Sequence, residues 1–186
     1  MTPPKEKSDT WVGLDCKTGV KQDLLALVLH GYWVCHDFPG AKLTIDHVAV
    51  GPNGVFSVSA EQQAELKKGK GPGDTRVIYD GQHVRFPLWV DTKCLDRAKR
   101  QARWLSRWLG GAVGEAVTVY PLVVLPGWLV NRRKWGDVVL VHEKDYAFLT
   151  TSRSRTLSDG LITRISRELE QRYRDAGPAI RGNRGG

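Results

Sequence analysis

Hydrophobic positions along the chain follow a helical period in three places. Apolar side chains recur at steps of three and four within residues 17–30 and 91–109, which predicts two amphipathic helices. We expect Gly31 to end the first helix and Gly110-Gly111 to end the second. Ser158 is a suitable N-cap for a third helix. The predicted apolar faces are Val20, Leu24, Leu27 and Val28, then Leu95, Ala98, Ala102, Leu105 and Leu109, then Leu161, Ile162, Ile165 and Leu169.

Shorter apolar segments predict strands. Gly51-Pro52-Asn53-Gly54 and Asp80-Gly81 are strong turn signals, and each is flanked by two such segments, so both predict hairpins. The first strand of the first hairpin alternates, which predicts one face made of Leu43, Ile45, His47 and Ala49. Residues 117–125 are almost continuously apolar, as in a strand buried on both faces. Strands are expected at 32–37, 43–50, 55–58, 76–79, 83–86, 117–125 and 138–142.

The order of these elements predicts an α/β sandwich around a mixed sheet. The chain has 186 residues, enough for one domain with a real core. We expect a disordered lead at residues 1–10, a single domain at 11–175 and a flexible tail at 176–186. The lysine- and glycine-rich residues 61–74 and the basic residues 131–134 are expected to be loops.

The charge balance favours an anionic partner. Lysine and arginine number 28 against 20 acidic residues, a net charge of +8. Nucleic acid is the commonest partner of such a domain, although a mildly basic solvated surface has the same charge. The three cysteines show no metal-binding or disulfide spacing. The sequence has neither a secretory signal pattern nor an apolar run long enough to span a bilayer, so we expect a cytoplasmic protein without a membrane partner.

The first predicted hairpin carries the most informative chemistry. Asp46 lies on its first strand, just before a tight turn that leads into the return strand. Side chains two apart on the return strand share a face, so this geometry can hold carboxylates at one point. Carboxylate oxygens are preferred ligands of hard divalent cations, which generate nucleophilic water in metal-dependent nucleases.

The run Ile45-Asp46-His47, followed by Gly51-Pro52-Asn53-Gly54-Val55-Phe56, resembles the nuclease-related domain (NERD) family. That family is similar in fold to restriction endonucleases of the PD-(D/E)xK type. Residues 31–37, Phe86-Pro87-Leu88 and 119–126 resemble its other landmarks, so the likeness covers about residues 13–130. It implies a restriction-endonuclease-like mixed β-sheet core flanked by helices, a nucleic-acid partner and a bacterial setting.

The chain departs from the family pattern where catalysis would need it. Ser59 stands where the family has glutamate, and Glu61 where it has lysine. Either the site is degenerate, which we favour, or it has migrated along the strand. In the migrated site, Asp46 and Glu61 would be catalytic and would hold Mg²⁺ or Mn²⁺, while Gln63 would position water. The family's Gly-Glu pair in the first helix is also absent, since Gly19-Val20 occupies that region.

Other candidates are weighed against structural roles. His47 shares its predicted face with apolar residues and is expected to be a hydrogen-bonded core residue. Trp104 is expected either to stack unpaired bases or to cover a neighbouring element. The favoured function is nucleic-acid binding, most simply of DNA, with weakened or lost metal-dependent phosphodiesterase activity; the alternative is a non-catalytic protein-interaction module. The residues expected to track phosphates are Lys93, Arg97, Arg100, Arg103 and Arg107.

Overall fold

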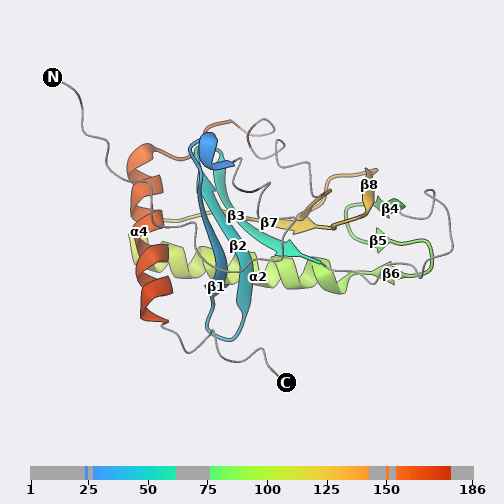
Figure 1. Cartoon of the computed structure of the whole chain (residues 1–186), viewed down its shortest axis with the longest axis horizontal. Coiled ribbons are helices and arrows are strands. Elements are labelled where there is room, and N and C mark those ends of the chain that lie inside the picture. Colours follow the sequence, from blue (N-terminus) through green and yellow to red (C-terminus); the bar gives the residue numbers. More distant parts are fainter. Residues whose placement is uncertain (1–23, 25–26, 62–75, 143–149, 151–153, 177–186) are drawn as a thin grey trace.

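A five-stranded mixed sheet forms the centre of the molecule (Figure 1). The computed structural model describes residues 24, 27–61, 76–142, 150 and 154–176. The first three strands of this large sheet are antiparallel, and the last two add to it in parallel. In spatial order they are β1 (Trp33–Pro39), β2 (Thr44–Gly51), β3 (Gly54–Ala60), β7 (Val119–Val124) and β9 (Val139–Val141).

A smaller sheet lies at one end of the molecule and a helix at the other (Figure 1). Helix α2 (Lys93–Val113) runs between these ends, and helix α4 (Asp159–Asp175) packs against it and against β1 and β2. The strands of the small sheet are, in spatial order, β6 (Val90–Asp91), β5 (Val84–Arg85), β4 (Arg76–Tyr79) and β8 (Leu129–Arg132).

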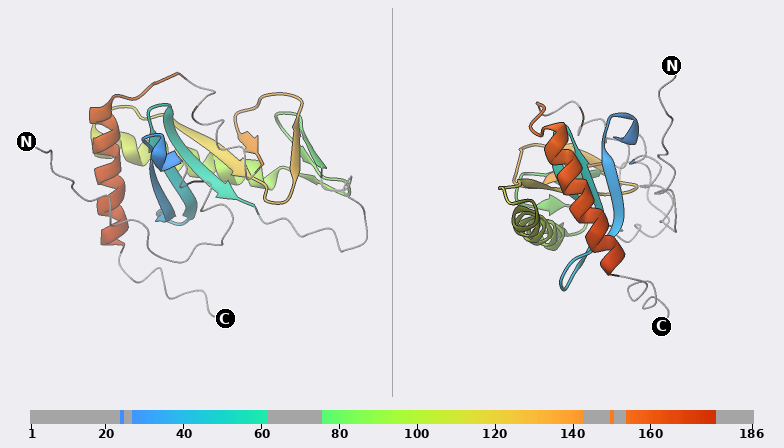
Figure 2. Two further views of the ribbon diagram at one scale, coloured as in Figure 1. Left: turned by 45° about the horizontal axis from the view of Figure 1, so that its top comes forward. Right: turned by 90° about the vertical axis from the view of Figure 1, so that its left-hand side faces the viewer.

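Apolar clusters lie on both faces of the large sheet, and Figure 2 shows α2 against one of these faces. On one face, Leu105 and Leu109 of α2 pack with strand residues such as Val48. On the other face, Leu24 and Leu27 pack against Ala49 and its neighbours. The first half of α2 contributes to a third cluster, in which the small sheet meets the ends of β7 and β9.

The mixed α/β architecture is the one that the sequence predicts. The Asn53-Gly54 turn joins β2 to β3 as expected, and Gly54 adopts a φ of 137°. Ser158 caps α4, since its side-chain oxygen accepts a hydrogen bond from the Leu161 amide at 3.2 Å. Cys35 is a buried free thiol packed within the core.

Three local predictions are wrong. Helix α2 continues through Gly110-Gly111 to Val113, because it is Gly114, with a φ of 77°, that takes the left-handed capping conformation. Strand β2 does not keep one alternating face: Ile45 joins Val48 on the α2 side, while Ala49 faces the opposite cluster. The basic segment 131–134 is partly strand, because β8 extends to Arg132 by pairing with β4.

Several expectations fall on residues outside the described part of the chain. These are the lead at 1–10, most of the first helix, the segment 62–75, Gln63, and the tail from residue 177. The described end of the first helix agrees with the prediction, since Gly31 follows it with a φ of 79°. None of the helices described is both long and apolar enough to cross a membrane.

Candidate functional site

Asp46 lies where β2 parts from β3. The last ladder pair between these strands is His47 with Val58. Beyond it, the Asp46 carboxylate accepts a hydrogen bond from the Ala60 amide at 3.0 Å. Burial raises the pKa of Asp46, and the Ala60 hydrogen bond partly offsets that effect because it stabilises the charged form. The Asp46 carboxylate thus takes the place of a backbone acceptor for the Ala60 amide. It lies where the ladder between β2 and β3 ends.

Ser59 is buried against helix α2 and hydrogen-bonded to it. Its hydroxyl donates a hydrogen bond to Oε1 of Gln101 at 2.6 Å, and the side chain is almost fully buried. The amide nitrogen of Gln101 donates in turn to the Thr44 carbonyl at 2.9 Å. A buried polar group that is fully hydrogen-bonded is a structural tie between elements. Ser59, which the resemblance aligns with a glutamate of the nuclease-related domain family, therefore connects β3 to α2.

Glu61 forms an ion pair with Arg97 of α2. The Glu61 amide donates to the Val124 carbonyl at 3.0 Å, which continues the pairing of β3 with β7 and directs the side chain toward the helix. The hydrogen bond from Arg97 to Glu61 is the main cause that raises the pKa of the guanidinium. Because Arg97 also lowers the pKa of Asp46, its charge acts on both carboxyl groups.

Asp37 is a further acidic residue near the site. It lies on β1 between the pairs His36–His47 and Phe38–Ile45, which places it opposite Asp46. Its φ of 48° is in the left-handed region, which is unusual for a residue other than glycine. Its negative charge is one of the causes that raise the pKa of Asp46. Sequence reasoning missed it because pairing across strands is decided by register.

The described residues do not fit a divalent cation. Within them, no group of three or more histidine, cysteine, aspartate or glutamate side chains is placed to hold a metal ion. Asp46 already accepts the Ala60 amide, and Glu61 is neutralised by Arg97. A hard cation prefers several free carboxylate or carbonyl oxygens, so this donor set is poor. Gln63, the third member of the migrated site, lies outside the described residues.

His47 has the structural role that its sequence context predicts. It is 5% exposed, and its Nδ1 lies 2.6 Å from Nδ1 of His36 on the neighbouring strand. One of the two nitrogens must donate and the other accept, which requires at least one neutral ring. Burial, together with the charge of His36, lowers the pKa of His47 to about 3.

The basic residues of α2 differ in what they contact. Arg100, Arg103 and Arg107 are exposed, as is Lys93 at the start of the helix. Arg97 instead reaches back to Glu61, on the flank that also carries Gln101. A polar residue inside the apolar spacing of the helix, such as Gln101, is the signal that could have identified this flank from sequence.

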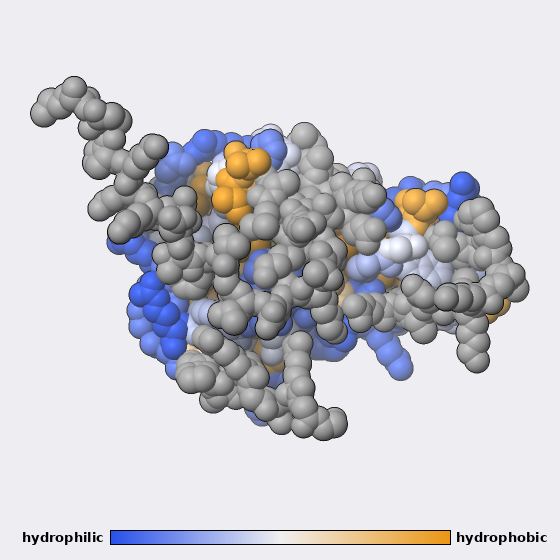
Figure 3. Space-filling model, in the orientation of Figure 1, coloured by the Kyte–Doolittle hydropathy of each residue, from blue (hydrophilic) through white to orange (hydrophobic). Residues whose placement is uncertain are grey.

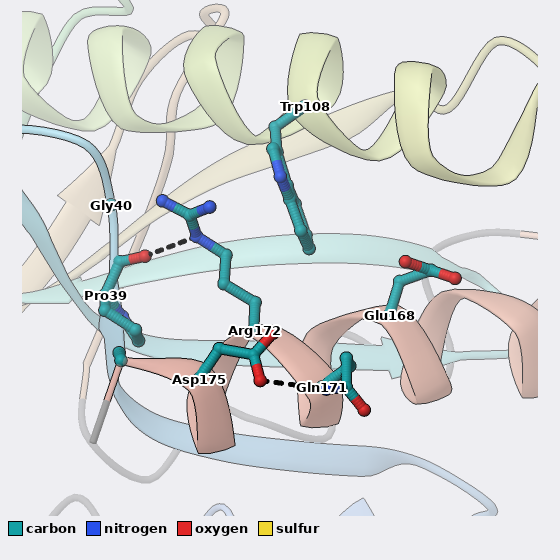
Figure 4. A pocket seen from close by; sticks show the side chains of 8 residues that line it. Pro39, Gly40, Trp108, Glu168, Gln171, Arg172 and Asp175 are labelled. Atoms are coloured by element: carbon teal, nitrogen blue, oxygen red, sulfur yellow. Dashed lines mark hydrogen bonds between the residues drawn. The ribbon is translucent and has the colours of Figure 1, made fainter.

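Trp104 packs within the molecule. Its ring is stacked on Trp108 with centroids 6.1 Å apart, and it also contacts Phe38. The guanidinium of Arg172, from α4, lies 5.2 Å from the Trp104 ring centroid. It donates a hydrogen bond to the Pro39 carbonyl, which Figure 4 shows beside Trp108. A groove of about 480 Å³ lies beside Trp108 and Arg172. Of the two roles considered for Trp104, this packing favours covering the neighbouring α4.

Comparison with known proteins identifies the family. The family model for the nuclease-related domain matches residues 18–126, which span β1 to β7, the Asp46 hairpin and α2. No curated protein and no solved structure matches the chain. The match covers more than half of the chain and includes every described residue of the candidate site. The chain therefore belongs to the nuclease-related domain (NERD) family.

Proposed function

We propose that this chain binds nucleic acid through the exposed basic side of α2 and that its nuclease activity is weakened or lost. Membership of the family implies a nuclease-related function and suggests nucleic acid and a metal ion. The observation that carries the proposal is the ion pair between Glu61 and Arg97, beside a Ser59 already tied to Gln101. Both positions of the family's glutamate and lysine are thus engaged within the fold.

The loss of activity follows from electrostatics. A divalent cation at Asp46 and Glu61 would have to displace the Arg97 guanidinium or approach it closely, and like charges at short range repel strongly. Ser59 offers a neutral oxygen whose hydroxyl is committed to Gln101. If cleavage does persist, Mg²⁺ or Mn²⁺ at Asp46 and Glu61 would supply the activating charge.

Binding is supported by cations that the fold leaves available. In the described part of the chain, Arg100, Arg103 and Arg107 make no ion pair, and all three are exposed on one side of α2. Their spacing of three and four residues aligns them along the helix axis. A row of arginines suits contacts to successive phosphates, which supply most of the sequence-independent affinity for DNA.

The binding test compares two triple variants. Replacing Arg100, Arg103 and Arg107 with alanine should weaken binding to duplex DNA, because phosphate contacts are lost. The salt dependence of log K should become shallower by about 2 to 3. The matched control replaces Arg155, Arg164 and Arg174 with alanine, which removes the same amount of positive charge. These three arginines already pair with Asp159, Glu115 and Glu170. Fluorescence anisotropy across a salt series measures both.

Two outcomes would contradict the binding proposal. If the wild-type protein fails to bind duplex or single-stranded DNA at low salt, the proposal is wrong and the protein-interaction module becomes the better account. If the control triple variant loses as much affinity as the α2 variant, only net charge matters and the α2 surface is not the binding site.

The cleavage test uses Mn²⁺ with single- and double-stranded DNA. Wild type and Asp46→Ala should both leave the substrates intact, while circular dichroism confirms that both are folded. Cleavage by wild type that disappears in Asp46→Ala would show a working site. Gln63→Ala would then test the migrated arrangement.

A further inference from the structure

An exposed tryptophan lies on the connection between β8 and β9. Trp135 is 64% exposed, a large value for the largest apolar side chain. The guanidinium carbon of Arg132 lies 4.4 Å from its ring centroid, and the neighbouring Arg133 and Lys134 are exposed. This connection is at the small-sheet end of the molecule, where Figure 3 shows hydrophobic surface among hydrophilic surface.

The backbone around Trp135 is held firmly in place. The Arg133 amide donates to the Tyr79 carbonyl at 2.8 Å, and the Tyr79 hydroxyl donates to the Val138 carbonyl at 2.8 Å. Gly136 touches the Gly81 turn so closely that an added Cβ would lie 2.1 Å from the Gly81 carbonyl oxygen. Trp135 therefore lies between two residues whose backbone is fixed, Arg133 and Gly136. Binding a ligand there would cost little conformational entropy of the chain.

The charge around Trp135 is positive. Two aspartates lie nearby, but each is paired with a basic side chain: Asp80 with Arg85 at 3.3 Å and Asp137 with Lys99 at 3.5 Å. Arg133 and Lys134 make no ion pair with the described residues, and the Arg132 guanidinium donates a hydrogen bond to the Leu140 carbonyl at 2.6 Å. The Lys99–Asp137 pair also places this connection beside α2, which carries the proposed phosphate contacts.

We propose that Trp135 stacks on an unpaired base of a nucleic-acid strand, while Arg133 and Lys134 contact the adjacent phosphates. The proposal rests on the nucleic-acid binding put forward above and adds a preference for single strands. Aromatic side chains beside cations bind unpaired bases without sequence preference, because every base has a π-face. In a duplex those faces are stacked on one another. The β8–β9 connection lies outside residues 18–126, which the family model matches.

The test measures the affinity of the full chain for an oligothymidylate and for a duplex of equal length. Trp135→Ala should weaken oligothymidylate binding about 5- to 100-fold, while duplex affinity stays within about twofold. Trp135→Phe, which keeps an aromatic face, should retain most of the affinity. Leu129→Ala is the matched control, because Leu129 is an exposed apolar residue on β8 that is 50% exposed.

Each outcome decides between the proposals. Wild-type binding that is unchanged in Trp135→Ala, or weakened equally for single strands and duplex, overturns the stacking role while leaving the α2 surface standing. A loss as large in Leu129→Ala as in Trp135→Ala also overturns it. If wild type binds neither probe, the proposed function fails and the stacking role fails with it.

Discussion

The candidate site and the β8–β9 connection use polar and aromatic side chains in opposite ways. At the site, Asp46, Ser59 and Glu61 each bond to another part of the chain: Ala60, Gln101 and Arg97. At the β8–β9 connection, the anchoring hydrogen bonds run from the Arg133 amide to the Tyr79 carbonyl and from the Tyr79 hydroxyl to the Val138 carbonyl, while the side chains of Trp135, Arg133 and Lys134 are exposed. Side chains that could bind a ligand are hydrogen-bonded within the fold in the first region. In the second region such side chains are exposed at the surface.

The family assignment makes Asp46 and the residues of β3 the candidate site, yet these side chains are hydrogen-bonded within the fold. The proposed nucleic-acid surface lies instead on α2 and beside the small sheet. Three predictions concern the buried residues of the core and candidate site, with exposed residues of the small sheet for comparison. They begin with the largest expected effect.

The first compares two leucines. Leu105 is fully buried between α2 and the large sheet, whereas Leu129 is half exposed on the small sheet. Leu105→Ala should lower the free energy of unfolding by about 2–5 kcal/mol, because it removes packed methylene groups and leaves a cavity. Leu129→Ala should change it by less than about 0.5 kcal/mol. Urea denaturation measures both, and similar losses would mean that the small sheet is as tightly packed as the core.

The second concerns acid. The pKa of His47 is lowered from 6.5 to about 3 in the folded protein, so the unfolded chain takes up this proton first as pH falls. Stability is therefore present above pH 6.5 and is lost progressively below it, by about 1.4 kcal/mol per pH unit. Between pH 6.5 and pH 4.5 the loss through His47 should be about 2–3 kcal/mol.

Denaturation at a series of pH values measures this loss. His47→Gln should flatten the acid limb of the stability curve, because the group with the lowered pKa is removed. A curve that is equally steep in His47→Gln would show that another group causes the acid sensitivity.

The third compares two glutamines. Gln101→Ala should cost about 1–3 kcal/mol, because the Ser59 hydroxyl and the Thr44 carbonyl lose their partner in a buried setting. Gln82→Ala, in the exposed turn of the small sheet, should be within about 0.5 kcal/mol of wild type. Thermal melts followed by circular dichroism compare the two. An equal, small effect would show that Ser59 does not depend on Gln101.

The sequence predicts more of the fold than of the site. The Asn53-Gly54 turn and the Ser158 cap act over a few residues, so their signals are local and both predictions are confirmed. The end of α2 was misplaced because glycine at 110 is tolerated within the helix and only Gly114 takes a positive φ. At the site, Asp46 is identified from its motif. Arg97 was predicted to contact phosphates with the other basic residues of α2, because helical periodicity does not show that its side chain pairs with Glu61.

By itself the sequence identified the family and the positions of most strands and helices, and it predicted that Ser59 and Glu61 stand where the family has glutamate and lysine. Only the tertiary structure decided what these two residues do. Glu61 meets a cation 36 residues away, and Ser59 meets an amide 42 residues away. Such pairs depend on where α2 crosses the sheet. That crossing is set by the packing of the whole apolar core and is not encoded in any local pattern.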